Sequence, residues 1–234
     1  MKTKSYLYLG LIVLLTISLV VISHGLDGVV LFKSLSVPIN KQILYQTTTL
    51  LISVFLLLVL KSVKKNEFKA YFRKGDVSAK IYPEPYVGIN PKPNENWSHV
   101  GKNLAIVITL VTAIIIYFQI IHESQIKFIS LFKILPISIL FALTNSFVEE
   151  VITRFSVVVT LKNIISDKYI SIISGVIFGT VHFWGNPGGF VGLLVAGFLG
   201  WFLAKSMLET KGIFWAWFIH FLQDIVIITA LLSI

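Results

Sequence analysis

Six ionisable residues lie inside three strongly apolar stretches of this 234-residue chain: Glu149, Glu150, Arg154, His182, His220 and Asp224. A charged side chain near the centre of a bilayer costs about 2.5 to 3.5 kcal/mol on insertion scales, so such residues are candidates for function. Carboxylates and imidazoles together can take a proton from water and stabilise the charge that develops when the water attacks. We therefore expect these side chains to form a water-activating site.

The spacing of these residues divides them into pairs. Glu150 and Arg154 are four residues apart and so share a helical face. His220 and Asp224 are related in the same way. Glu149 lies about 100° around the helix from Glu150 and is expected to face a different neighbour. The alternative is a cluster that only fixes helix packing, in which each acidic residue neutralises the basic residue of its own pair.

The composition explains why these residues stand out. Hydrophobic residues make up 56% of the chain and charged residues 13%, which predicts an integral membrane protein of the all-α class. We expect a polytopic helical bundle with about seven or eight transmembrane helices. The chain has no cysteine, which excludes disulfides, thiolate zinc sites and a cysteine nucleophile. No nucleic-acid partner is expected, because the net charge of +9 fits basic loops at a bilayer surface.

Long apolar segments must position the six residues. We predict them at about 6–23, 43–60, 104–121, 128–165, 169–183, 190–204 and 213–234. Segment 128–165 is too long for one simple span, and Pro136 is the predicted place for a kink or restart. Polar loops containing Glu123 and Pro187 separate other segments. Small residues recur every four positions from Gly192 to Gly200, a pattern that predicts close packing against another helix.

The longest polar stretch, residues 61–103, contains nine of the 20 Lys and Arg residues but only four Asp and Glu residues. By the positive-inside rule, this loop and the N-terminus are predicted to be cytoplasmic in a multi-pass protein of the cell membrane. The triplet Asn96-Trp97-Ser98 matches a glycosylation sequon that a cytoplasmic loop would not use. Trp97 is expected at the membrane interface instead.

Three motifs follow one another within residues 128–232: Glu-Glu-x-x-x-Arg from Glu149, Phe-x-x-x-His from Phe178 and His-x-x-x-Asp from His220. Each motif is weak alone, but the ordered set within hydrophobic helices is specific. It resembles the CPBP family, the CAAX proteases and bacteriocin-processing enzymes also called the Abi family. On this resemblance, residues 1–127 are N-terminal transmembrane helices with the basic loop, and residues 128–234 are the catalytic helical core.

The resemblance implies an intramembrane glutamic endopeptidase, which hydrolyses a peptide bond with an activated water molecule. Glu149 is then the general base, and His182 helps to polarise the attacking water. Glu150 and Arg154 orient the site. A second carboxylate and a dry pocket disfavour ionisation of a glutamate, and Arg154 would counter that effect.

The resemblance also implies that His220 and residue 224 stabilise the oxyanion. Some family members carry Asn at the last position, whereas Asp224 can donate a hydrogen bond only when protonated. Orientation of His220 is therefore the alternative role for Asp224. No cofactor is expected, but Glu149, His182 and His220 would form a His-His-carboxylate set if the enzyme used zinc.

The implied substrate is a membrane-associated peptide or protein, because eukaryotic relatives trim prenylated C-termini. The Lys-, Ile- and Asn-rich chain looks bacterial, which suggests bacteriocin leaders, peptide pheromones or self-immunity. A proton-coupled transporter or relay is one rival hypothesis, since such carriers also use intramembrane Glu, His and Asp. A non-catalytic membrane partner or immunity protein with the same architecture is another.

Overall fold

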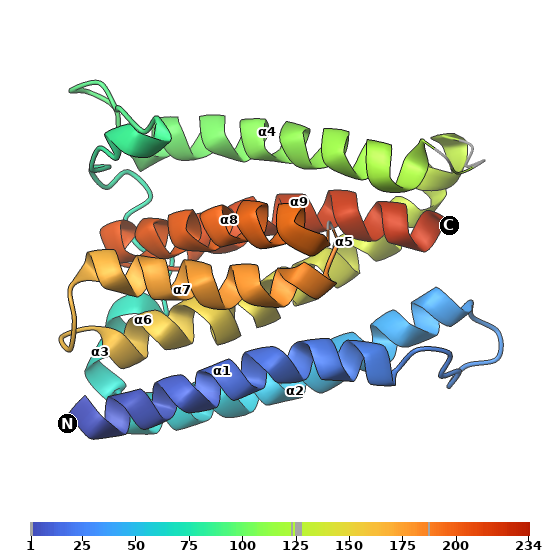
Figure 1. Ribbon diagram of the computed structural model, residues 1–234, viewed down its shortest axis with the longest axis horizontal. Coiled ribbons are helices and arrows are strands. Elements are labelled where there is room, and N and C mark those ends of the chain that lie inside the picture. The colour runs from blue at the N-terminus through green and yellow to red at the C-terminus, as the bar shows by residue number, and fades with distance from the viewer. Residues whose placement is uncertain (1, 123, 125–127, 187) are drawn as a thin grey trace.

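The computed structural model describes residues 2–122, 124, 128–186 and 188–234, so the predicted loop residues Glu123 and Pro187 lie outside the described part. Apart from two isolated bridges, the regular structure of the described part is helical. Figure 1 shows the long helices running side by side in one bundle. The α-helices are α1 (Lys2–Gly25), α2 (Val37–Val63), α3 (Lys65–Tyr71), α4 (Trp97–Ile116), α5 (Phe128–Glu150), α6 (Ser156–Leu161), α7 (Asp167–Val181), α8 (Gly189–Thr210) and α9 (Phe214–Ser233).

Among the described residues, six helical segments are long and apolar enough to cross a membrane. They comprise α1, α2, α8, α9, the stretch Trp97–Ile121 that begins with α4, and the stretch Ile129–Leu161 that joins α5 to α6. The seventh long helix, α7, has 15 residues and therefore a length of about 22 Å, which is shorter than the core of a bilayer. The all-α polytopic bundle predicted from the composition is confirmed.

The stretch Ile129–Leu161 is continuous, so the restart predicted at Pro136 is not found. Proline is tolerated within membrane helices because neighbouring groups satisfy the backbone that it frees. The irregularity lies later, in a π-helical turn at Val151–Phe155 that directly follows Glu150. Such turns often occur at functional sites, because the extra residue changes which neighbour the following side chains face.

Close packing of α7 against α8 depends on glycine. A Cβ atom added to Gly179 would lie 2.6 Å from the backbone oxygen of Leu193, and one added to Gly200 would lie 2.9 Å from the Phe178 Cβ. The packing predicted for the small-residue stripe is therefore found at Gly200, whereas Gly192 lines a cavity. This contact fixes the position of Phe178 and of the turn that follows α7.

The basic loop docks on the cytoplasm-predicted end of the bundle. The Ile213 backbone N–H donates to the Arg73 oxygen at 2.9 Å, and the Asp76 N–H donates to the Thr210 oxygen at 2.8 Å. Trp97 is fully buried and donates from Nε1 to Glu209 at 2.8 Å, so its side chain packs inside the protein at the start of the span Trp97–Ile121. In Figure 1 this end lies opposite the connection between α1 and α2.

Candidate active site

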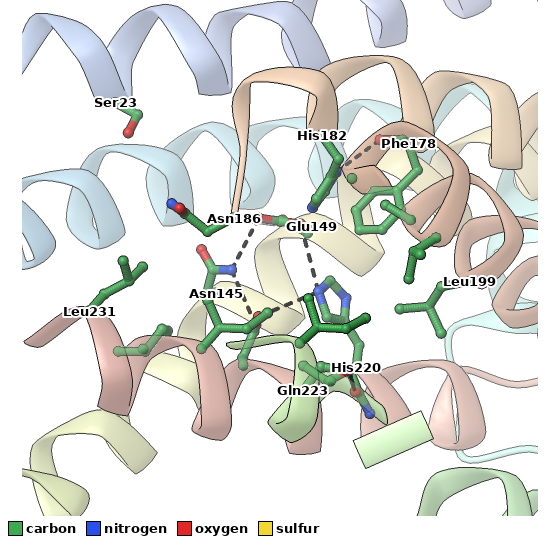
Figure 2. Close-up of a pocket in the computed structure, with 18 of the residues that line it drawn as sticks. Ser23, Asn145, Glu149, Phe178, His182, Asn186, Leu199, His220, Gln223 and Leu231 are labelled. Carbon is green, nitrogen blue, oxygen red and sulfur yellow. Dashed lines mark hydrogen bonds and ion pairs between the residues drawn. The ribbon is translucent and has the colours of Figure 1, made fainter. Parts of the chain in front are cut away.

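A cavity of about 190 Å³ opens within the bundle, between α1, α2, α4, α5, α7, α8 and α9. Four of the six residues singled out in the sequence line it: Glu149, His182, His220 and Asp224. Glu150 and Arg154 do not line it, and their side chains are completely buried behind it. Figure 2 shows Glu149 and His182 lying close together on the wall of this cavity. The structure thus separates the two adjacent glutamates into different surroundings.

Glu149 is held by neighbours on two helices. Its Oε1 accepts a hydrogen bond from the Asn145 Nδ2 at 3.0 Å, one turn earlier on α5. Its Oε2 lies 3.7 Å from the His220 Nε2 on α9. The side chain is 14% exposed, against 0% for Glu150, because it faces the cavity. Glu149 is therefore the glutamate that a water molecule in the cavity can reach.

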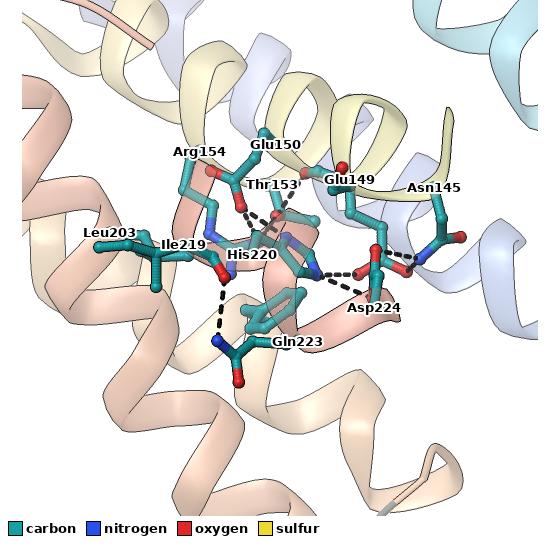
Figure 3. A network of polar contacts seen from close by, with 12 residues as sticks. Asn145, Glu149, Glu150, Thr153, Arg154, Leu203, Ile219, His220, Gln223 and Asp224 are labelled. Carbon is teal, nitrogen blue, oxygen red and sulfur yellow. Dashed lines mark hydrogen bonds and ion pairs between the residues drawn. The ribbon is translucent and has the colours of Figure 1, made fainter. Parts of the chain in front are cut away.

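Glu150 forms the centre of a buried charge cluster, shown in Figure 3. Its Oε1 accepts from the His220 Nδ1 at 2.7 Å and lies 3.3 Å from the Arg154 Nη1. The Arg154 guanidinium sits 3.4 Å above the centre of the Phe178 ring and donates to Thr153 at 2.5 Å. Buried ion pairs repay their desolvation only when further hydrogen bonds and stacking contacts satisfy both partners. These contacts link α5, the π-helical turn, α7 and α9.

His182 occupies the first position of the 3₁₀ turn His182–Trp184 after α7. Its Nδ1 lies 2.8 Å from the Phe178 carbonyl oxygen, and its ring packs 4.0 Å from the Phe178 ring, centre to centre. A carbonyl oxygen can only accept, so Nδ1 carries the proton in this contact. The neutral ring then leaves Nε2 as an acceptor, the form in which a histidine can take a hydrogen bond from water.

His220 lies between three carboxylates. Its Nδ1 faces Glu150, and its Nε2 lies 3.6 Å from the Asp224 Oδ1 and 3.7 Å from Glu149. Asp224 in turn accepts from the Asn145 Nδ2 at 3.1 Å. Both ring nitrogens can donate at once only when the ring is the imidazolium. The geometry therefore equips His220 to present a donor toward the cavity while Glu150 fixes its orientation.

Sequence reasoning missed Asn145, which bridges Glu149 and Asp224 through one amide nitrogen. Its position one turn before Glu149 in an apolar stretch was a signal that could have found it. It also missed Tyr45 and Gln46 of α2. Tyr45 lines the cavity, and the Gln46 Nε2 donates to the Asn145 Oδ1 at 3.2 Å. No local pattern marks these α2 residues, because only tertiary packing brings them to the site.

The same side chains also bear on the alternative of a metal site. Glu149, His182 and His220 are residue types that zinc accepts. Within the described ranges, no group of three or more His, Asp or Glu residues is arranged to hold a metal ion. One ring nitrogen of each histidine already faces an oxygen acceptor, which leaves only the Nε2 atoms as ligands. These contacts leave each Nε2 able to bind water or a metal ion, because metal-ligating histidines also hold their other ring nitrogen to an oxygen acceptor.

Comparison with known proteins finds a family match over the part of the chain that holds this site. Residues 130–226 match the family model described as type II CAAX prenyl endopeptidase, Rce1-like, and the matched range contains all six ionisable residues. No curated protein and no solved structure matches significantly. Proteins of the matched family are proteases, and the six spans place this one in a membrane. Over residues 130–226, the chain is similar to the Rce1-like family of type II CAAX prenyl endopeptidases.

Proposed function

We propose that the protein hydrolyses a peptide bond of a membrane-associated peptide, using a water molecule activated by Glu149 and His182. The observation that carries the proposal is the unequal placement of the two glutamates. Glu149 faces the cavity beside His182, whereas Glu150 is turned into the bundle. A general base must lie within reach of the water that it activates, and only Glu149 meets that condition.

The proposed reaction begins with water held between the Glu149 carboxylate and the His182 Nε2. Glu149 takes a proton from this water while the water oxygen attacks the scissile carbonyl carbon. The tetrahedral intermediate carries an oxyanion, to which His220 donates a hydrogen bond from Nε2. Glu149 then passes its proton to the leaving amine, and the C–N bond breaks. The carboxylate is thereby regenerated, so one residue serves as base and then as acid.

The remaining residues act through these three. Glu150 fixes His220 through the His220 Nδ1, and Arg154 pairs with Glu150 in the closed interior. Asp224 lies 3.6 Å from the His220 Nε2, so it orients His220 rather than replacing it as a donor. Asn145 separates the carboxylates of Glu149 and Asp224 by donating to both. No metal is part of this proposal.

For the substrate, we propose a peptide of a bacterial cell: a bacteriocin, a pheromone or a target in self-immunity. The matched family acts on membrane-associated, prenylated peptides or proteins. Apolar residues of α8 and α9 line the cavity beside the polar site, among them Val195, Leu199, Ile227 and Leu231. Such walls suit a hydrophobic peptide or a lipidated one.

The experiment compares membrane peptides from cells that carry the wild-type protein and cells that carry the Glu149→Gln variant. Peptides that accumulate uncut with the variant identify the substrate, which is then cleaved by the purified protein in nanodiscs. Cleavage that resists chelators and proceeds without bound zinc supports the metal-free route. Proton or solute flux in proteoliposomes that depends on Glu149, without any cleavage, would replace this proposal by the transporter hypothesis.

A further inference from the structure

A second cavity, of about 210 Å³, adjoins the first and is lined by the last turns of α1, the start of α2 and residues around Glu149 and His182. The two cavities share part of their lining, including Glu149, His182 and Lys41. Among the described residues that line either cavity, Lys41 is the only Lys or Arg. A lysine side chain therefore lines the same two cavities as the proposed base, and it lies four residues, about 6 Å along α2, before Tyr45.

The lysine is held in place by the loop that precedes α2. The neighbouring residue Asn40 is fully buried, and its side chain accepts from the backbone N–H groups of Leu31 and Phe32. The same side chain donates to the carbonyl oxygens of Phe32, Leu35 and Ser36. These five hydrogen bonds fix the loop against the start of α2. The backbone of Lys41 is therefore held in a defined position at the start of α2.

The known partner of Lys41 lies outside the cavities. Its Nζ donates to the Asp27 Oδ1 at 2.5 Å, and Asp27 lines neither cavity. This hydrogen bond and the charge of Lys41 lower the pKa of Asp27, so Asp27 stays ionised at neutral pH. An ammonium group has three N–H donors, and Asp27 uses one of them. The group can hold Asp27 and a second carboxylate at the same time.

The charges along the cavity wall are therefore arranged in order. Glu149 and Asp224 line the first cavity from α5 and α9, apolar residues of α8 and α9 line it beside them, and Lys41 lines it from the start of α2. A peptide with an acidic group close to Glu149 would be repelled, whereas an acidic group nearer Lys41 would be attracted. The wall suits an apolar peptide that carries a carboxylate a few residues from the bond to be cut.

From this arrangement we propose that Lys41 forms an anionic subsite, which binds a carboxylate of the peptide substrate and sets its register relative to Glu149. The inference rests on the proposed peptidase function and names a feature of its substrate. The carboxylate belongs either to the C-terminus of the peptide or to an acidic side chain. In both cases the lysine ammonium group pairs with a carboxylate. The site is partly exposed, since the Lys41 side chain is 29% exposed.

The test measures binding and cleavage separately, with the full-length protein in nanodiscs. The probe is a mixed-sequence library of short apolar peptides, made with a free C-terminal carboxylate and as the matching amides. A second pair of libraries carries Asp or Asn near an amidated end. Binding is measured with the Glu149→Gln variant, which is not expected to cut the probes, and cleavage with the protein that retains Glu149. Each protein is tested with Lys41 and as Lys41→Gln, Lys41→Arg and Lys33→Gln.

We expect the acidic member of one pair to be favoured about fivefold, as a partly exposed charge pair supports. Lys41→Gln should abolish that preference, and Lys41→Arg should retain it. Lys33→Gln should also retain it, because Lys33 lies in the same exposed connection but lines neither cavity. Equal binding of both members of each pair, or a preference that survives Lys41→Gln, would overturn the proposal.

The binding arm keeps this inference separate from the peptidase function. A charge preference in binding without any cleavage would support the subsite and contradict the proposed function. Cleavage that depends on Glu149 but ignores the charge of the peptide would do the reverse. The pair of libraries that shows the preference identifies the source of the carboxylate.

Discussion

The buried cluster of Glu150, Arg154 and His220 predicts strongly unequal effects of single and double substitutions. Glu150→Gln keeps an oxygen that can accept from His220 but leaves the Arg154 guanidinium without a carboxylate. Both side chains are 0% exposed, so the unpaired charge should cost about 3 to 5 kcal/mol of stability. Arg154→Met should cost less, about 1 to 3 kcal/mol, because the His220 Nδ1 still donates to Glu150 at 2.7 Å.

The double variant removes both charges, and we expect it to be more stable than Glu150→Gln alone. The assay is thermal unfolding in nanodiscs, where a loss of 3 to 5 kcal/mol lowers the Tm of a chain of this size by about 6 to 20 °C. A double-variant cycle isolates the coupling between the two residues. Additive losses, or a Glu150→Gln variant as stable as the wild type, would refute the reasoning that the pair compensates charge inside the bundle.

Three further predictions follow from other contacts. Asn145→Ala should lower kcat about tenfold or more with little change in KM, because one donor serves both Glu149 and Asp224; unchanged steady-state kinetics would contradict this. Gly179→Ala should destabilise the α7–α8 contact by about 1 to 3 kcal/mol in thermal unfolding, whereas Gly10→Ala, with no atom near its Cβ position, should not. The chain has no cysteine, so single cysteine variants can report its orientation. Ser23→Cys, at a residue that lines both cavities, should react with an impermeant maleimide added to intact cells, whereas Tyr86→Cys, at an exposed residue, should react only after lysis. The reverse pattern would mean that the predicted orientation is inverted.

Much of the fold follows from composition and periodicity. Apolar segments of sufficient length must become helices in lipid, because no other open structure satisfies the backbone there. The π-helical turn at Val151–Phe155 had no such signal, since no Gly or Pro in it interrupts the helical pattern of α5. The burial of Trp97 was equally hidden, because it depends on Glu209 from a helix more than a hundred residues later. Local sequence therefore predicts where helices form, but it does not predict these tertiary contacts.

Part of the candidate site could likewise be predicted from the sequence, and part could not. Residue types and four-residue spacing identify Glu149, Glu150, Arg154, His182, His220 and Asp224 without a structure. The offset of about 100° between adjacent helix positions already predicts different neighbours for Glu149 and Glu150, and the structure shows which one faces the cavity. The parts supplied by α2, Tyr45 and Lys41, needed the packing of a distant segment to be visible. Their chemical roles remain predictions to be measured.

The most direct test of the central claim is the cleavage rate of Glu149→Gln beside that of Glu150→Gln, in nanodiscs and with the substrate identified from cells. Glu149→Gln should remain as stable as the wild type and lose roughly a hundred- to ten-thousandfold in kcat, the range expected for a missing general base. Glu150→Gln should retain measurable turnover in the fraction that stays folded, while its Tm falls. Undiminished cleavage by a folded Glu149→Gln protein would contradict the account.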